Sequence, residues 1–309
     1  MKKKITTMML IAAMSLSLMA CGGGSSEPET KAPETKAAAS EATAETEQLA
    51  TETESTSKSV SLAEEIVIAD NDECTVKITG IDPDNVWGYT LNAYLENKSS
   101  DKTYMFAVEY AAINGVQTDP LFATEVAAGK KTNAEISFFD ENLEKNNIGD
   151  FTDIEISFIV YDTDNWADDY VADEIVHIYP YGEENAVTFT REAQNSDNVI
   201  LDNEYATVIV TGYEDDDIWG YTANLFIINK TDKDIMFSVE DASVNGYMAD
   251  PYFATVVTAG KCEFTSISWD DETLEENGIT EIEEIEFSLD VYDNDDWTSY
   301  SNETITLNP

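Results

Sequence analysis

After about residue 60, apolar and polar positions alternate along the chain with a period of two rather than 3.6. Residues 87–96 illustrate the pattern, because every second side chain there is aromatic or aliphatic. This period is typical of half-buried strands, whose successive side chains point to opposite faces. The pattern, with Asn-Gly and Ala-Gly-Lys turn signals between segments, predicts seven strands and one helical turn over 140–147. The expected strands are residues 64–69, 74–80, 87–96, 103–113, 132–139, 153–161 and 171–179.

The strand pattern occurs twice. Trp87-Gly88-Tyr89-Thr90 recurs as Trp219-Gly220-Tyr221-Thr222, an offset of 219 − 87 = 132. A one-residue deletion then shifts the offset to 131, at which Ala128-Gly129-Lys130 matches residues 259–261. Each copy is long enough for its own core. The sequence therefore predicts two tandem all-β repeats, at 63–185 and 186–309.

The N-terminus has the composition of a secretion signal. Three lysines precede an uncharged, mostly apolar segment, residues 5–20, which is short for a membrane-spanning helix. It ends in Leu18-Met19-Ala20-Cys21-Gly22, which resembles the lipobox of bacterial lipoproteins. The resemblance implies a signal peptide at 1–20, a lipid thioether on Cys21, and a place on the outer face of the cell membrane. The alternative is an ordinary secretory signal with an incidental cysteine.

Residues 21–62 are rich in Gly, Ser, Ala, Thr, Glu and Pro and contain no aromatic residue. Such a segment cannot bury enough apolar surface to offset the entropy of ordering. We expect a disordered tether between the lipid anchor and the repeats.

Seven short strands with Trp87 opening the third indicate an antiparallel immunoglobulin-like β-sandwich in each repeat. Three features carry a further resemblance: Asn97-Lys98 at the end of the third strand, the Ala-Gly-Lys turn and the lipobox. Through them, residues 60–309 resemble the immunoglobulin-like domains of Gram-positive surface lipoproteins. Proteins of this group mostly have no defined activity, so the resemblance implies a fold and a location only.

The net charge of −47 argues against nucleic acid and anionic lipid headgroups as partners of the folded part. Cys74 and Cys262 stand at non-equivalent places in the two repeats, which favours buried thiols over a disulfide. His177 is the single histidine, and no nucleophile, phosphate-loop or paired-cysteine motif occurs. We therefore expect a protein that is not an enzyme.

Acidic loops are the strongest candidate site. In an immunoglobulin-like sandwich, we expect the loop after the second strand and the loop after the sixth to lie at one end. Their carboxylates would suit calcium, which takes six to eight oxygen ligands. We further expect the tip of the second repeat, including Glu214 and Asp216, to face the first repeat. The alternative is a solvated acidic surface without a cation. The candidate metal ligands are Asp82, Asp84, Asp162, Asp164, Asp168, Asp215, Asp217, Asp293, Asp295 and Asp296.

Each acidic tip also carries tryptophans. We expect Trp87 and Trp219 to be core residues, and Trp166 and Trp297 to be candidate ligand contacts. Exposed Trp166 and Trp297 would favour a binding or adhesion module for a carbohydrate or a surface protein. Buried ones would favour a structural spacer or envelope-shielding protein without a ligand site.

Overall fold

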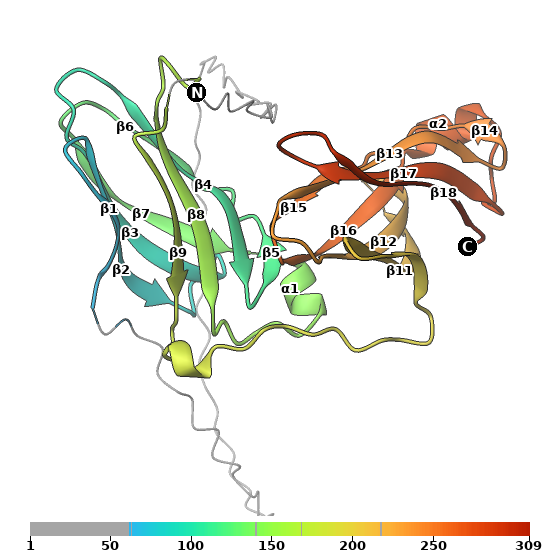
Figure 1. The fold of residues 1–309 in the computed structure, drawn as a ribbon, viewed down its shortest axis with the longest axis horizontal. Helices are drawn as coiled ribbons and strands as arrows, with labels where there is room; N and C mark the ends of the chain where they lie inside the picture. The colour runs from blue at the N-terminus through green and yellow to red at the C-terminus, as the bar shows by residue number, and fades with distance from the viewer. Residues whose placement is uncertain (1–61, 63, 140, 168, 217) are drawn as a thin grey trace, which may run out of the picture. The chain divides into compact units, whose positions relative to one another are not determined.

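The computed structural model describes residues 62, 64–139, 141–167, 169–216 and 218–309 (Figure 1). As expected, their regular secondary structure is almost all β. Both repeats belong to one compact unit. Within the described residues, no helix is long and apolar enough to cross a membrane.

The first repeat contains nine strands and one short helix. The seven expected strands are present within two residues of their expected bounds, and α1 lies in the expected helical turn. The two additional strands, β5 and β6, are only three and four residues long, too short for alternation to reveal. The elements are β1 (Ile66–Asp70), β2 (Cys74–Asp82), β3 (Tyr89–Asn97), β4 (Tyr104–Ile113), β5 (Val116–Thr118), β6 (Ala123–Val126), β7 (Lys131–Phe138), α1 (Glu141–Lys145), β8 (Ile154–Asp162) and β9 (Ala172–Ile178).

The second repeat has the same element order. Even a strand irregularity recurs, since the register shifts between Val67 and Ala69 in β1 and between Val199 and Leu201 in β10. A 3-10 turn, η1 (Glu183–Asn185), precedes the second repeat. Its elements are β10 (Asn198–Asp202), β11 (Ala206–Asp216), β12 (Gly220–Asn229), β13 (Ile235–Val244), β14 (Tyr247–Met248), β15 (Ala254–Val257), β16 (Cys262–Trp269), α2 (Asp271–Glu276), β17 (Ile285–Asp293) and β18 (Ser299–Leu307).

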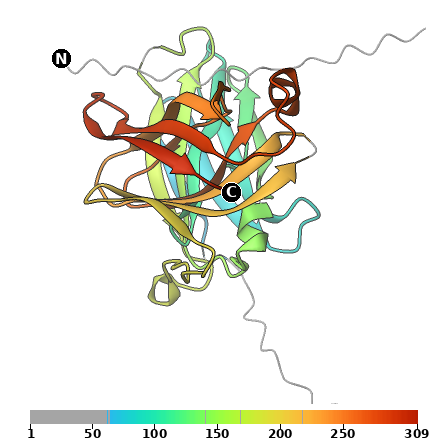
Figure 2. The same cartoon turned by 90° about the vertical axis from the view of Figure 1, so that its right-hand side faces the viewer.

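Each repeat is a two-layer sandwich. In the first, the antiparallel sheet β1-β2-β3-β7 packs on the sheet containing β4, β8 and β9. Leu91 and Leu95 from one layer meet Phe106 and Phe158 from the other in a single buried cluster. In the second, β10-β11-β12-β16 packs on β13, β17 and β18, and Figure 2 shows the orange-red layer above the yellow one.

The repeated Trp-Gly-Tyr-Thr sequence forms a tight entry into β3 and β12. Gly88 and Gly220 have positive φ values of 93° and 78°. A Cβ on Gly88 would lie 2.4 Å from the Phe138 carbonyl oxygen, so only glycine fits. The tryptophans just before these glycines are turned outward. The expectation that Trp87 and Trp219 are core residues is wrong, because they are 68% and 56% exposed.

Asn97 and Asn229, from the repeated Asn-Lys pair, cross-link three segments each. The Asn97 Nδ2 donates to the Lys102 and Val126 carbonyl oxygens, both at 2.8 Å. Asn229 makes the equivalent bonds at 2.7 and 2.8 Å. This part of the repeated sequence therefore has a structural role.

The two repeats meet at β5 and β16. Cys262 pairs with Val116 in parallel, and its backbone N–H donates to the Gly115 carbonyl oxygen at 3.1 Å (Figure 1). The Gln117 amide bonds the second repeat twice: Nε2 donates to the Val256 carbonyl oxygen at 2.7 Å, and Oε1 accepts from the Thr258 N–H at 2.9 Å. The β5 strand thus extends the edge of the second repeat's sheet.

The connecting segment covers the outer face of that sheet. The Phe189 N–H donates to the Asn114 carbonyl oxygen of the first repeat at 2.8 Å. The Phe189 ring packs edge-on against Phe226 and Phe264, with centroid distances of 6.3 and 5.8 Å. Arg191, held by two 2.7 Å bonds to Asp197, lies 5.7 Å from the Phe226 ring centre. The connection is therefore packed, although it has little regular structure.

Candidate functional site

The two acidic loops of the first repeat lie at opposite ends of the sandwich, not at one end. Asp162 pairs with Tyr104 and forms a 3.3 Å ion pair with Lys102, beside the end of β3. Asp82 stands at the far end of β2, eight residues from Cys74, which pairs with Asn97 at the Asp162 end. At the usual rise per residue, that separation is about 26 Å. The expectation that Asp82 and Asp84 join Asp162 and Asp164 in one cation site is wrong.

The cause is an additional edge strand. β1 lies at the edge of its sheet, beside β2, although it is the first of the seven expected strands. The loop that crosses between layers is consequently 98–103, after the third strand, and this loop shares an end with 162–171. Because β1 is the first of the expected strands, the loop expected beside 162–171 is the one after the second strand instead of the one after the third.

The second repeat has the same division. The Asn294 N–H donates to the Asp234 carbonyl oxygen, and the Asp234 carboxylate accepts from the Ala259 N–H at 2.9 Å. Asp293, Asp295 and Asp296 therefore lie at the end that carries the 258–261 turn, next to the junction. Asp215, which pairs with Tyr221, lies at the other end together with Glu214 and Asp216. Only half of the expected tip is on the junction side.

Asp293 is the most engaged carboxylate in these loops. It is buried and bonds to Lys233, to the Asp295 and Asp296 N–H groups at 2.9 and 3.1 Å, and to the Tyr300 hydroxyl at 3.0 Å. Burial alone would raise its pKa. The Lys233 ammonium and the other donors outweigh burial and lower the pKa to about 2. The charge of Asp293 is thus balanced within the chain.

Asp162 takes the same place in the first repeat. The Asp164 N–H donates to it at 3.0 Å, and Asn165 and Lys102 also contact it. The Asp164 N–H is the main cause that holds the pKa of Asp162 below its usual value. Asp162 thus organises the turn between β8 and β9, and Asp293 organises the turn between β17 and β18.

Within the described residues, no group of three or more His, Cys, Asp or Glu side chains is arranged to hold a metal ion. Calcium binding stays a prediction. The candidates Asp168, Asp217 and Cys21 lie outside the described residues.

Four tryptophans are exposed at the ends of the sandwiches. Trp166 and Trp297 are 54% and 64% exposed, in the loops that Asp162 and Asp293 organise. Trp297 stacks on Tyr292 with a centroid distance of 5.4 Å and an interplanar angle of 12°. Trp87 and Trp219 lie at the opposite ends, and Trp219 contacts Tyr252 edge-on at 6.3 Å.

The remaining candidates for chemistry are two cysteines and one histidine, and each lies among contacts within the fold. Cys74 and Cys262 are free and buried, as expected. His177 contacts Asp153 at 2.8 Å and Glu155 at 3.3 Å, and Glu155 also pairs with Lys261 of the second repeat at 2.6 Å. The histidine therefore lies beside the ion pair that joins the repeats.

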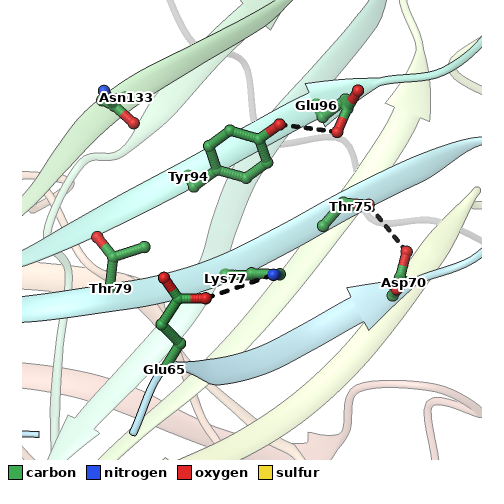
Figure 3. A pocket seen from close by; sticks show the side chains of 8 residues that line it. All are labelled: Glu65, Asp70, Thr75, Lys77, Thr79, Tyr94, Glu96 and Asn133. Carbon is green, nitrogen blue, oxygen red and sulfur yellow. Dashed lines mark hydrogen bonds and ion pairs between the residues drawn. The ribbon is translucent and has the colours of Figure 1, made fainter.

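Sequence reasoning missed an open groove on the outer face of the β1-β2-β3-β7 sheet (Figure 3). The groove has a volume of about 470 Å³, within the range of small-ligand sites. Outward positions that differ between the repeats, such as Tyr94 against Phe226, were the available signal. Its lining residues are Glu65, Asp70, Thr75, Lys77, Thr79, Tyr94, Glu96 and Asn133.

Comparison with known proteins yields no family. The chain matches no protein-family profile and no curated protein. Among solved structures, a protein of unknown function from Porphyromonas gingivalis W83 is similar at 12% identity and a TM-score of 0.21, covering 72% of this chain and 91% of that one. The YadV chaperone is similar at 11% identity and a TM-score of 0.23, covering 71% of this chain and 92% of that one. At these TM-scores, neither similarity carries an argument about function.

Proposed function

We propose that this protein is a surface lipoprotein, anchored through Cys21, whose two immunoglobulin-like repeats form a non-catalytic module that binds carbohydrate. The lipobox sequence supports the anchor. The strand order supports the repeat type, since β2, β3 and β7 in one layer and β4, β8 and β9 in the other follow the immunoglobulin arrangement.

The observation that carries the binding function is the exposure of Trp166 and Trp297 at equivalent ends of the two repeats. Large aromatic side chains are usually buried, and a soluble domain that exposes them repeatedly commonly uses them in recognition. An indole ring offers a flat face for stacking, and the neighbouring carboxylates accept hydrogen bonds from hydroxyl groups.

A glycan array tests this function with the mature chain and the double variant Trp166→Ala/Trp297→Ala. We expect the double variant to lose the signal of the wild-type protein. The matched control is Trp87→Ala/Trp219→Ala, at the opposite ends, which should retain that signal. Retention by the first variant, or binding only to surface proteins, would contradict the carbohydrate function at these loops.

The second candidate function is a spacer that holds another group away from the membrane. It is favoured by the junction, where Gln117, Lys261 and Phe189 join the repeats firmly. A chain that binds no glycan, yet whose deletion exposes the envelope to large probes, would support the spacer.

The anchor has its own test. We expect Cys21→Ala to move the protein from the membrane fraction to the medium, because stable anchoring requires the acyl chains. Membrane retention of a mature, cleaved Cys21→Ala form would contradict the lipoprotein assignment.

A further inference from the structure

We propose that the groove on the outer face of the β1-β2-β3-β7 sheet binds a neutral oligosaccharide, with Tyr94 as its stacking platform. The site is separate from the Trp166 and Trp297 loops. It therefore stands or falls independently of binding there.

Tyr94 is held with its ring lying along the sheet. It stands on the central strand β3, in register between Lys77 of β2 and Asn133 of β7. Its hydroxyl donates to Glu96 Oε2 at 2.8 Å, which fixes the ring, and Figure 3 shows that ring face-on in the groove. A fixed ring face suits the C–H face of a sugar, because the aromatic face carries partial negative charge.

Hydrogen-bonding groups of both kinds surround the ring. Glu65 and Glu96 carry acceptor oxygens, whereas Lys77 and the Asn133 amide carry donors, and Asn133 is exposed. Thr75 and Thr79 add hydroxyl oxygens that can accept, because their O–H groups already donate to Asp70 Oδ1 at 2.9 Å and to the Asn92 carbonyl oxygen at 3.2 Å. A ligand rich in hydroxyl groups matches this mixture, since each hydroxyl also donates and accepts.

The groove lining carries three carboxylates and one lysine, and two further lysines, Lys98 and Lys131, lie beside it. Lys77 lies 3.4 Å from Glu65 and Lys98 lies 2.6 Å from Asp70, while the Lys131 ammonium lies 6.0 Å from the Tyr94 ring centre. Lys77 and Lys98 thus offset Glu65 and Asp70, and Lys131 adds a positive charge over the Tyr94 ring. A neutral ligand suits this balance, whereas an anionic polymer would be repelled by the acidic surface around it.

An extended peptide fits the groove less well. β2 already pairs with β1 and β3, and β3 already pairs with β2 and β7. The backbone groups of the groove floor are therefore used within the sheet and cannot bind another strand. Recognition must come from side chains, as it does for sugars.

The sandwich itself does not require a polar face here. At the equivalent register positions of the second repeat stand Ile209, Phe226 and Phe264, which pack at the junction. The first repeat has Lys77, Tyr94 and Asn133 instead, and this face remains open.

Isothermal titration calorimetry of the mature chain tests the proposal with neutral hexasaccharides of glucose or mannose, and with hexagalacturonate as the anionic probe. We expect Tyr94→Ala to weaken hexasaccharide binding about tenfold, from the loss of one aromatic contact. Tyr94→Phe keeps the stacking face and should retain most of the affinity. Asn133→Ala, at an exposed position that carries little folding risk, should weaken binding about threefold through one lost hydrogen bond.

The matched control is Trp87→Ala/Trp219→Ala, at exposed positions outside both the groove and the Trp166 and Trp297 loops, which should leave hexasaccharide affinity unchanged. Equal binding by wild-type protein, Tyr94→Ala and Asn133→Ala would overturn the groove proposal. So would preference for hexagalacturonate, or absence of any neutral hexasaccharide binding by the wild-type chain. Loss of hexasaccharide binding in Trp166→Ala/Trp297→Ala, with full binding by Tyr94→Ala, would overturn the groove and leave the proposed function standing.

Discussion

The outer faces of two equivalent sheets, β1-β2-β3-β7 and β10-β11-β12-β16, have the same backbone and opposite surroundings. The central cross-strand row is Lys77, Tyr94 and Asn133 in the first repeat and Ile209, Phe226 and Phe264 in the second. The first row lines an open groove. The second is covered by Phe189 and belongs with the first repeat's hydrophobic cluster.

This difference shows that the two copies of one fold can keep the same core while their outer sheet faces take different roles. The inward positions of both sheets stay apolar, because each must bury one face in its own sandwich. The outward positions are free to change, and they decide which repeat docks and which keeps its sheet face open. The comparison can be tested position by position.

The largest expected difference is between Phe226→Ala and Tyr94→Ala, which change equivalent positions. Phe226 is 3% exposed and packs against Phe189 and Phe264, so its truncation should cost about 3–5 kcal/mol of the free energy of unfolding. Tyr94 lies on the open face and should cost about 1 kcal/mol or less. Urea denaturation followed by circular dichroism measures the free energy of unfolding of both variants. Equally small losses would mean that Phe226 is not part of a buried junction.

A smaller effect is expected for Gln117→Ala. The substitution leaves the Val256 carbonyl oxygen and the Thr258 N–H without the partner they have in the wild-type chain. The expected cost is about 1–3 kcal/mol. The equivalent residue of the second repeat is Met248, which is 65% exposed, so Met248→Ala should be nearly neutral in the same assay. A neutral Gln117→Ala would show that the amide does not hold the repeats together.

The equivalent acids Asp293 and Asp162 should differ in their effect on acid stability. The pKa of Asp293 is about 2 in the folded chain, below its ordinary value of 3.8. Its contribution is therefore fully present above pH 4 and is lost as the pH falls from about 4 to 2. We expect Asp293→Asn to lower the free energy of unfolding by about 1–2 kcal/mol at pH 7, because hydrogen bonds are lost. The melting temperature of this variant should depend less on pH between about 4 and 2 than that of the wild-type protein.

The pKa of Asp162 is also lowered, and Asp162→Asn should show the same trend. Lys102, its partner, lies at 3.3 Å, and Tyr300 has no counterpart among the bonds to Asp162. We therefore expect a smaller change. Thermal melts between pH 7 and 2 measure both variants, and a steeper acid limb in Asp293→Asn would contradict the sign of the argument.

The smallest expected difference is between calcium and other salts. Lys233 and Lys102 already offset the charges of Asp293 and Asp162, and the other acidic loops lie at the far ends. We expect calcium, magnesium and sodium chloride at matched ionic strength to raise the melting temperature equally, through screening alone. A rise with calcium only, absent in Asp293→Asn/Asp295→Asn, would instead establish a cation site.

Much of the fold could be predicted from alternation, because buried positions repeat at every second residue along most of β2, β3 and β17. The ends of the sandwich could not, because β1 resembles any other short strand and only its pairing shows that it is additional. For the same reason the acidic loops were assigned to one end. Trp87 was expected in the core from its type, whereas the glycine after it turns the chain so that the indole faces out.

The groove was missed for a different physical reason. Polar residues at alternate positions of a strand normally indicate contact with solvent, so Lys77 and Asn133 gave no separate signal. The position of Tyr94 became informative only when its cross-strand neighbours and its counterpart Phe226 were known.

The buried thiol of Cys262 makes the junction measurable in time. Its Sγ lies 3.6 Å from the Gly115 carbonyl oxygen of the first repeat, and burial raises its pKa to about 12. A thiol in this state is unreactive toward alkylating reagents until the repeats separate and it ionises. Cys74, in the core of the first repeat, reports instead on opening of that core. The alkylation rate of Cys262 would therefore report the rate at which the repeats separate, and that of Cys74 the rate at which the core of the first repeat opens.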